Sequence, residues 1–316
     1  MKDVLVSVLC LTYNHEKYIE SALEGFVNQK TDFNFEVLVH DDASVDNTQL
    51  IVSQYAKKYP EIIKPIFQKE NQYSKGISIS EEILSKYARG KYIAICEGDD
   101  YWSDCFKLQS QIDYLEAHPE YSACVHNSYG EDVKTDKKKI IYKMRDKDLT
   151  FKDVIEEGGQ SFQSSSLIYR KQFLSNRPDF FRVMNSIGVE DYPLAIYLAL
   201  SGKIKYFGKP MSVYRMMTEN SWTKNNSNDD KLIIIYRAII VMLNSVNTYT
   251  QGKYQDTIST IILRNEYKIC LTSKNYKMLR NRKFAGIWKN TPWIARIKRI
   301  LYSYFGSILC RIRQKK

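Results

Sequence analysis

The sequence predicts an α/β fold in which a mostly parallel sheet is flanked by helices, followed by a helical C-terminal extension. Apolar, strand-like runs alternate with helix-like segments at the spacing typical of a parallel sheet. Two of these runs end in clustered acids: Val37-Leu38-Val39 leads into His40-Asp41-Asp42, and Ile93-Ala94-Ile95 into Cys96-Glu97-Gly98-Asp99-Asp100. Parallel sheets bind ligands beyond the carboxyl ends of their strands, so the acids predict one binding crevice there.

The elements are expected in this order. Val4 to Leu11 is an apolar run that predicts a strand, and a helix-like pattern follows at about 16–27. After the strand at 37–39, Asp46-Asn47-Thr48 can cap a helix that Tyr59-Pro60 ends. The pattern then predicts a strand at 62–67, a helix at 79–87, a strand at 92–96 and a helix from about 104 to 115.

The second half is less regular. The charged stretch 132–148 predicts a solvated hairpin or loop, 165–169 is strand-like, and 192–200 has helical spacing. Beyond Trp222 the pattern is helical, at 232–243 and 258–271. We therefore expect a catalytic domain at 1–222 and a helical region at 223–316, with the boundary near 225–228.

Charge and cysteine content narrow the function classes. The chain has 316 residues and a formal net charge of +11, but no acid follows Glu266, and the fourteen basic residues beyond it leave the first 266 residues at −3. The six cysteines are scattered without a Cys-x-x-Cys pair, which argues against a disulfide framework or a thiolate zinc site and favours a reducing cytoplasm. No signal peptide is indicated, and 232–243 is too short for a transmembrane helix.

Three polar motifs follow predicted strands, and each has a structural alternative. Glu97-x-Asp99-Asp100 offers the hard oxygen ligands that Mg²⁺ or Mn²⁺ prefers, or it is an acidic turn that caps the next helix. Asp41-Asp42-Ala43-Ser44-x-Asp46 could bind a pyrimidine base or a ribose, or only form a turn with a helix cap. Thr12-Tyr13-Asn14 could support a base ring, or end the strand with Asn14 as a cap.

The order of these motifs, with Glu190-Asp191 as a fourth, resembles family 2 glycosyltransferases of the GT-A fold, of the kind that builds bacterial surface polysaccharides. The resemblance covers about residues 4–222. It implies that Thr12, Tyr13, Asn14 and Asp42 hold the base and ribose of a nucleotide sugar. It further implies that Asp99 contacts the ribose or phosphate and, with Asp100, the divalent metal, and that Asp191 is the catalytic base.

Other residues are expected near the donor or acceptor. Lys75 could pair with the donor phosphates, although a flexible turn is the simpler reading of its segment. Gln163 and Ser164 resemble a segment close to the transferred sugar and acceptor, and Glu190 is placed on the same side. Many relatives have a histidine after a Tyr-Arg pair, whereas this chain has Tyr214-Arg215-Met216-Met217. Thioether sulfur is a poor ligand for Mg²⁺ or Mn²⁺, so Arg215 or water would substitute.

The resemblance implies an inverting, metal-dependent glycosyltransferase that uses a UDP sugar, with dTDP or GDP as alternatives. Residues 293–316 carry apolar positions at helical spacing among arginines and lysines, which fits either an anionic membrane surface or docking on the catalytic domain. A membrane-facing tail suits a lipid-linked saccharide acceptor and a cytoplasmic protein held at the inner face of the membrane. Two other classes remain: a nucleotidyltransferase, although the early Gly-rich basic loop is missing, and a nucleic-acid-binding protein, although the strand-end sites are acidic.

Overall fold

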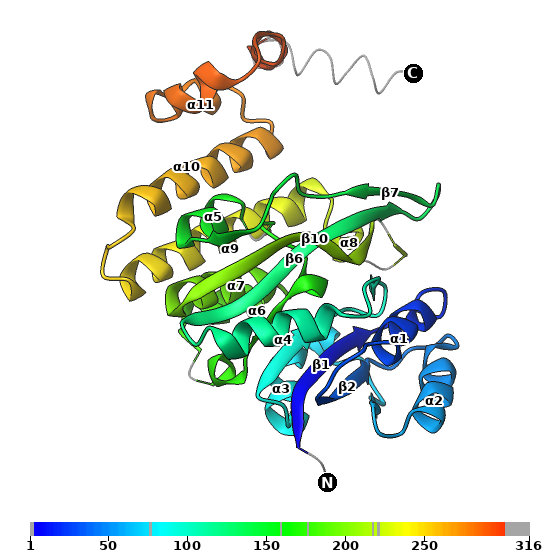
Figure 1. Cartoon of the computed structure of the whole chain (residues 1–316). Helices are drawn as coiled ribbons and strands as arrows, with labels where there is room; N and C mark the ends of the chain where they lie inside the picture. Colours follow the sequence, from blue (N-terminus) through cyan, green and yellow to red (C-terminus); the bar gives the residue numbers. More distant parts are fainter. Residues whose placement is uncertain are drawn as a thin grey trace, which may run out of the picture. The chain divides into compact units, whose positions relative to one another are not determined.

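The computed structural model describes residues 3–75, 78–158, 160–175, 177–216, 218–219 and 222–300. The chain divides into two compact units with the boundary between Lys224 and Asn225. The first unit is built on a sheet, and the second is helical (Figure 1).

Ten strands of the described residues form the sheet of the first unit, in the order β3-β2-β1-β4-β9-β6-β10-β5, with β7 beside β6 and β8 beside β10. The strands are β1 (Val4–Thr12), β2 (Asn34–Asp41), β3 (Ile63–Phe67), β4 (Tyr92–Ile95), β5 (Tyr101–Trp102), β6 (Tyr121–Asp132), β7 (Lys137–Ile140), β8 (Lys147–Leu149), β9 (Ile168–Arg170) and β10 (Lys203–Met216). The helices are α1 (Ile19–Val27), α2 (Thr48–Lys58), α3 (Ile79–Tyr87), α4 (Lys107–Ala117), α5 (Phe151–Glu156), α6 (Phe180–Asn185), α7 (Asp191–Ser201) and α8 (Trp222–Asn225), with short 3₁₀ turns η1 (Tyr73–Lys75), η2 (Ser164–Ser166) and η3 (Lys171–Leu174).

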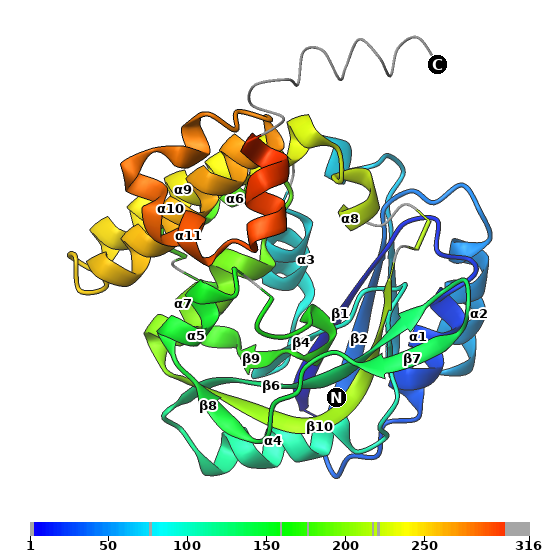
Figure 2. The same ribbon diagram turned by 90° about the horizontal axis from the view of Figure 1, so that it is seen from above.

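The half of the sheet formed by β3, β2, β1 and β4 is parallel throughout, as the alternating pattern predicts. Alternate strand residues such as Val8 and Val37 join a buried core with the apolar sides of α1, α2 and α4. Helix α3 lies on the other side of these strands from α1 and α2, as Figures 1 and 2 both show. With helices on both faces, the carboxyl ends of the strands are left for binding.

The other half of the sheet is mixed. The long strands β6 and β10 run parallel to each other, and β9 joins this half to β4 through antiparallel pairs (Figure 2). Strands β6 and β7 pair antiparallel, so the charged stretch 132–148 contains a hairpin, one of the two conformations expected for it. Strands β6 and β10 carry buried polar residues such as Asn127 and Ser212, and the mixed pattern hid both strands from sequence analysis.

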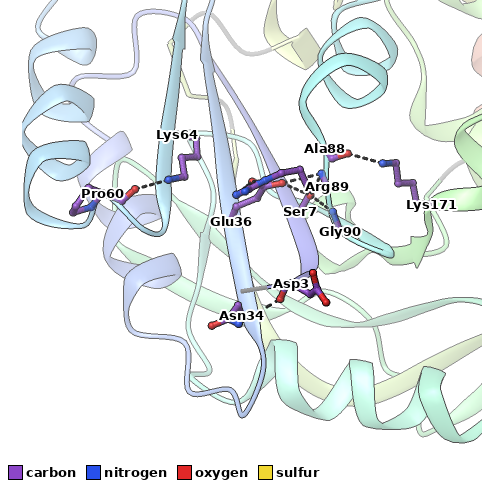
Figure 3. A network of polar contacts seen from close by, with 10 residues as sticks. All are labelled: Asp3, Ser7, Asn34, Glu36, Pro60, Lys64, Ala88, Arg89, Gly90 and Lys171. Carbon is purple, nitrogen blue, oxygen red and sulfur yellow. Dashed lines mark hydrogen bonds and ion pairs between the residues drawn. The ribbon is translucent and has the colours of Figure 1, made fainter. Parts of the chain in front are cut away.

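A polar network ties the parallel strands together away from their carboxyl ends (Figure 3). The buried Glu36 carboxylate on β2 accepts hydrogen bonds from Ser7 Oγ on β1 at 2.7 Å and from the backbone N–H of Arg89 at 2.9 Å. The Arg89 guanidinium also pairs with it, with Nη2 at 2.5 Å. Gly90 completes the network, because its N–H donates to Ser7 Oγ at 2.8 Å and a β-carbon there would collide with the backbone of β1.

We expect the substitution Glu36→Gln to lower the free energy of unfolding by about 1–3 kcal/mol, because it weakens a charge-assisted network around a buried carboxylate. The matched control is Glu156→Gln, which removes an exposed ion pair with Lys152 on α5 and should cost less than about 0.5 kcal/mol. Urea unfolding of the two variants measures both values. Equal losses would show that the buried network adds nothing beyond a surface ion pair.

The second unit contains α9 (Asp229–Tyr249), α10 (Gln255–Thr272) and α11 (Ala285–Asn290), with 3₁₀ turns η4 (Met278–Arg280) and η5 (Arg282–Phe284). The Asn228 side chain caps α9 by accepting the Lys231 N–H at 2.8 Å. Helix α9 has 21 residues, longer than the expected 232–243, so the reason given against a membrane span was wrong. By length and composition alone α9 could cross a membrane, which is weak evidence because core helices of soluble proteins pass the same test.

Candidate active site

The carboxyl ends of β1, β2 and β4 are joined by backbone contacts, which bring the three polar motifs together. The Asp42 N–H donates to Thr12 O at 3.0 Å, and the Gly98 N–H donates to Leu11 O at 2.8 Å. A β-carbon at Gly98 would lie 2.9 Å from both Cβ and Oγ1 of Thr12, so glycine is needed for this close approach. The buried Thr12 Oγ1 has no hydrogen-bond partner among the described residues.

The loops after β1 and β2 are fastened to each other. Asn14 has a left-handed backbone with φ 54°; its N–H donates to Ser44 Oγ at 2.8 Å, and its Oδ1 accepts the Val45 N–H at 2.9 Å. The amide thus orders this loop pair, while the neighbouring Tyr13 ring is 37% exposed and available to a ligand. The α2 cap comes from Asp46, whose carboxylate accepts the Thr48 N–H at 3.0 Å.

Asp42 holds the segment 70–75, which we call the strap. Its Oδ1 accepts the Gln72 N–H at 2.6 Å, its Oδ2 accepts the Tyr73 N–H at 3.0 Å, and its carbonyl accepts Asn71 Nδ2 at 3.3 Å. A carboxylate has about four lone-pair sites, so these bonds leave capacity for a ligand N–H or hydroxyl. Lys75 is exposed and forms an ion pair with Glu70 within the strap.

The motif after β4 forms an acidic cluster of Glu97, Asp99 and Asp100. Burial and repulsion from Asp99 and Glu97 raise the pKa of Asp100 well above its ordinary value. The surrounding protein and repulsion from Asp99 and Asp191 raise the pKa of Glu97 to about 8, although the Glu97 side chain remains accessible to solvent. Glu97 therefore belongs to the site, and sequence analysis gave it no separate role although it stands in the quoted motif.

Arg215 braces this cluster. Its backbone N–H donates to Asp100 Oδ1 at 3.0 Å and its Nη1 donates to Asp99 O at 2.9 Å. The rest of the guanidinium donates to Glu131 and to Ser21 Oγ, at 3.1 Å each. Arg215 was expected beside the donor or the metal, and the structure places it against the acidic loop itself. Thr218, which no sequence signal indicated, donates to Asp99 Oδ2 at 2.8 Å.

Glu190 ends the loop that follows α6, and Asp191 is the first residue of α7. The Asp191 side chain is exposed, accepts the Tyr192 N–H at 2.8 Å at the start of α7, and interacts electrostatically with Glu97. The surrounding protein raises the pKa of Asp191. Glu190 points to α3 instead, where its carboxylate accepts hydrogen bonds from Ser78 Oγ at 2.6 Å and from Ser80 Oγ.

Gln163 and Ser164 lie in the segment of η2, beyond the acidic loop. Gln163 donates to the hydroxyl of Tyr142 at 3.0 Å, and Ser164 begins the 3₁₀ turn. This segment is tied to the acidic loop because the Trp102 indole, two residues after Asp100, donates to Ser165 O at 2.9 Å. Lys107 Nζ, fully buried, lies 4.2 Å from the Trp102 ring centroid, and burial lowers its pKa to about 7.

The donor set suits a hard divalent cation. No group of three or more His, Cys, Asp or Glu side chains in the described ranges is arranged to hold a metal alone. Mg²⁺, however, is commonly held by one or two carboxylates together with substrate phosphates. Asp99 Oδ1 and Asp100 Oδ2 have no hydrogen bond to the described residues. Burial and repulsion from Asp99 and Glu97 raise the pKa of Asp100, and a cation would relieve the repulsive part. Met217 lies outside the described residues.

Comparison with known proteins identifies the family. Residues 7–177 match glycosyl transferase family 2. An uncharacterized protein of Mycobacterium tuberculosis is 34% identical over 226 residues, covering 69% of this chain and 60% of that protein. The Escherichia coli protein UDP-Glc:alpha-D-GlcNAc-diphosphoundecaprenol beta-1,3-glucosyltransferase WfgD is 34% identical over 115 residues, covering 36% of this chain and 42% of WfgD.

A solved structure, that of TarS of Staphylococcus aureus, shares the fold of this chain. Residues 1–349 of Staphylococcus aureus TarS in complex with UDP-GlcNAc match with a TM-score of 0.57 at 16% identity, covering 94% of this chain and 79% of that one. The expected α/β fold of the GT-A type is thereby confirmed. The family match, rather than the fold, sets aside the nucleotidyltransferase and nucleic-acid-binding interpretations. The matched domain covers more than half of the sequence, and the chain belongs to glycosyl transferase family 2.

Proposed function

We propose that the protein is an inverting, metal-dependent glycosyltransferase that moves a sugar from a UDP sugar to a hydroxyl of a lipid-linked saccharide in polysaccharide biosynthesis. The observation that carries the proposal is the assembly of Asp42, the acidic cluster and Asp191 at the carboxyl ends of β1, β2 and β4. The names of two similar proteins support the substrate classes, a UDP sugar for both and a diphosphoundecaprenol-linked acceptor for WfgD.

In this proposal the nucleoside binds between the loops after β1 and β2. The half-exposed Tyr13 ring contacts the base, while the remaining lone pairs of Asp42 accept a base N–H or a ribose hydroxyl. Thr12, also proposed for the nucleoside, accepts the Asp42 N–H through its carbonyl, and its buried Oγ1 lacks a partner among the described residues. Asn14 contributes by ordering the loop rather than by contacting the nucleoside, because its side-chain Oδ1 already accepts the Val45 N–H.

Asp99 and Asp100 would hold Mn²⁺ or Mg²⁺ against the donor diphosphate. The cation supplies neutralisation of the charge that develops on the departing nucleotide diphosphate. The chain's own residues prepare the place for it: Arg215 and Thr218 fix the orientation of the two aspartates by hydrogen bonds. Lys75 stays a proposal for the donor phosphates, and Gln163, Ser164 and Glu190 for the sugar and acceptor side. In the protein the side chains of Lys75, Gln163 and Glu190 already bond to Glu70, to Tyr142 and to Ser78 and Ser80.

Asp191 acts as the general base that takes the proton from the acceptor hydroxyl as it attacks the anomeric carbon. Its exposed carboxylate starts α7 and keeps one oxygen on the Tyr192 N–H, which fixes its direction. The raised pKa of Asp191 makes it a stronger base than an ordinary aspartate once it is deprotonated. Direct attack with proton removal inverts the anomeric configuration.

The substitution Asp191→Asn should lower kcat by about 10² to 10⁴-fold and leave donor affinity unchanged, because it removes the base but keeps the shape of the side chain. In the wild type, activity should fall at acid pH with a midpoint above that of an ordinary aspartate, since only the deprotonated carboxylate accepts a proton. Asp179→Asn, at an exposed position on the preceding helix, is the control and should behave like the wild type. Near-normal transfer by the Asp191 variant would remove its role as base.

The function itself is tested by calorimetry with UDP, dTDP and GDP, each with and without Mn²⁺. We expect UDP to bind most tightly, and its affinity to rise at least about tenfold with Mn²⁺, because the cation screens the diphosphate from Asp99 and Asp100. Asp100→Asn should abolish most of the metal effect. If no nucleoside diphosphate binds, the proposal fails; if metal has no effect, the metal-dependent part fails.

We propose that residues 293–316 hold the enzyme on an anionic membrane surface, near its acceptor. In the described part, residues 293–300 are helical, and Trp293, Ile294 and Ile297 are exposed beside Arg296 and Lys298. Near such a surface each cation contributes about 1 kcal/mol, so several give reversible binding. The positions from 301 on that complete the expected stripe, including Tyr304, Phe305 and Ile308, lie outside the described residues.

A chain truncated after Asn290 should lose most of its binding to anionic vesicles in a sedimentation assay. It should keep its activity on a soluble acceptor analogue, since the residues proposed for chemistry are all in the first unit. Vesicles of neutral lipid are the control and should bind neither protein well. Unchanged binding to anionic vesicles, combined with a lower melting temperature, would favour the alternative in which the tail packs on the protein.

A further inference from the structure

The strap meets the loop that carries Asp191. Gly188 has a left-handed backbone with φ 69°, and the Tyr73 ring lies directly against it. A β-carbon at position 188 would be 2.8 Å from Cε2 and 2.9 Å from Cζ of Tyr73, and it would overlap the hydroxyl oxygen. Because glycine leaves room for the ring, the two segments pack closely although 115 positions separate them in the sequence.

The backbone of Tyr73 is held by Asp42, on the donor-binding side of the site. The Tyr73 N–H donates to Asp42 Oδ2 at 3.0 Å, and the Gln72 N–H donates to Asp42 Oδ1 at 2.6 Å. Tyr73 therefore contacts both parts of the site. Its backbone binds Asp42, which is proposed to bind the nucleoside, and its ring packs on Gly188, three residues before the proposed base. About half of the Tyr73 side chain remains exposed, so the ring is not a core residue.

We infer that Tyr73 is a positioning residue that couples Asp42 to the loop carrying Asp191, so that the donor-binding side sets the place of the base. The inference rests on the proposed function. Turn geometry supports it, because the loop 186–191 is short and is held by backbone bonds from Gly188 to Asn185 O and from Val189 to Met184 O. A displacement of the Tyr73 ring is therefore passed to Asp191 rather than absorbed by a long loop.

Tyr73→Ala separates the two contacts, because alanine keeps the backbone N–H on Asp42 but removes the ring from Gly188. We expect kcat to fall about tenfold or more, since small misplacement of a reacting group is costly, while UDP affinity stays within about twofold. Tyr73→Phe should restore kcat to within about twofold if ring packing carries the coupling. The control is Tyr87→Ala at the far end of α3, a similarly exposed tyrosine that should not change kcat.

A double-mutant cycle gives a result that a merely structural role would not. Gly188→Ala alone should lower kcat about tenfold, because the new methyl group displaces the Tyr73 ring. In the Tyr73→Ala background the same change should cost less than about threefold, because the ring is gone and only backbone strain remains. Gly158→Ala is the control for backbone strain. Gly158 also has a left-handed backbone, with φ 61°, but an added β-carbon there would meet no atom within 4 Å.

Additive effects of Tyr73→Ala and Gly188→Ala would overturn the inference, as would equal losses of kcat and UDP affinity in Tyr73→Ala. Either result leaves the proposed function standing, provided that UDP still binds the wild type and Asp191→Asn still lowers kcat as predicted above. If the wild type neither binds UDP nor transfers sugar, the proposed function fails instead. Melting temperatures of all variants, measured beside the kinetics, separate loss of fold from loss of coupling.

Discussion

The parallel pairing of β1 with β2 and β4 is the constraint on which the site depends. Thr12 is in register with Asp41, and Leu9 with Ile95, so the three strands end at one edge of the sheet. Hydrogen bonding then carries the chain one step further, because Thr12 and Leu11 accept the N–H groups of Asp42 and Gly98. Two acidic motifs more than fifty positions apart in the sequence become neighbours through backbone bonds alone.

Charge is the second organising property of this edge. The hydrogen bonds of the Arg215 guanidinium within the described residues go to Glu131, Ser21 and a backbone carbonyl of the acidic loop, so it orients this loop while Glu131 offsets much of its charge. Lys75, the other cation expected here, is paired with Glu70. The carboxylates of the cluster still repel one another, and burial together with this repulsion raises the pKa values of Glu97 and Asp100. Such a site favours ligands that bring positive charge with them.

Sequence patterns predicted the features that depend on neighbouring residues, such as strands and helix caps. The strands that end at Thr12, Asp41 and Ile95 are mostly apolar. The cap of α2 lies in the expected Asp46-Asn47-Thr48, where the carboxylate of Asp46 makes the bond. The interactions that depend on distant partners were not predictable. Nothing near Glu190 in the sequence indicates Ser78 and Ser80, and nothing near Asp42 indicates the strap. Strands β6 and β10 were missed because their buried polar residues break the alternation.

The two ends of the parallel strands contribute differently to the stability of the folded protein. Around Glu36 the carboxylate is paired and bonded, which stabilises the fold. At the other end, Glu97 has a pKa of about 8 in the folded chain, above its value when unfolded, so its contribution to stability is full at acid pH and is lost as pH rises toward 8. Near neutrality the acidic motif is thus a stability–activity trade-off. Neutral substitutions there would raise the free energy of unfolding but remove the carboxylates proposed to hold the metal.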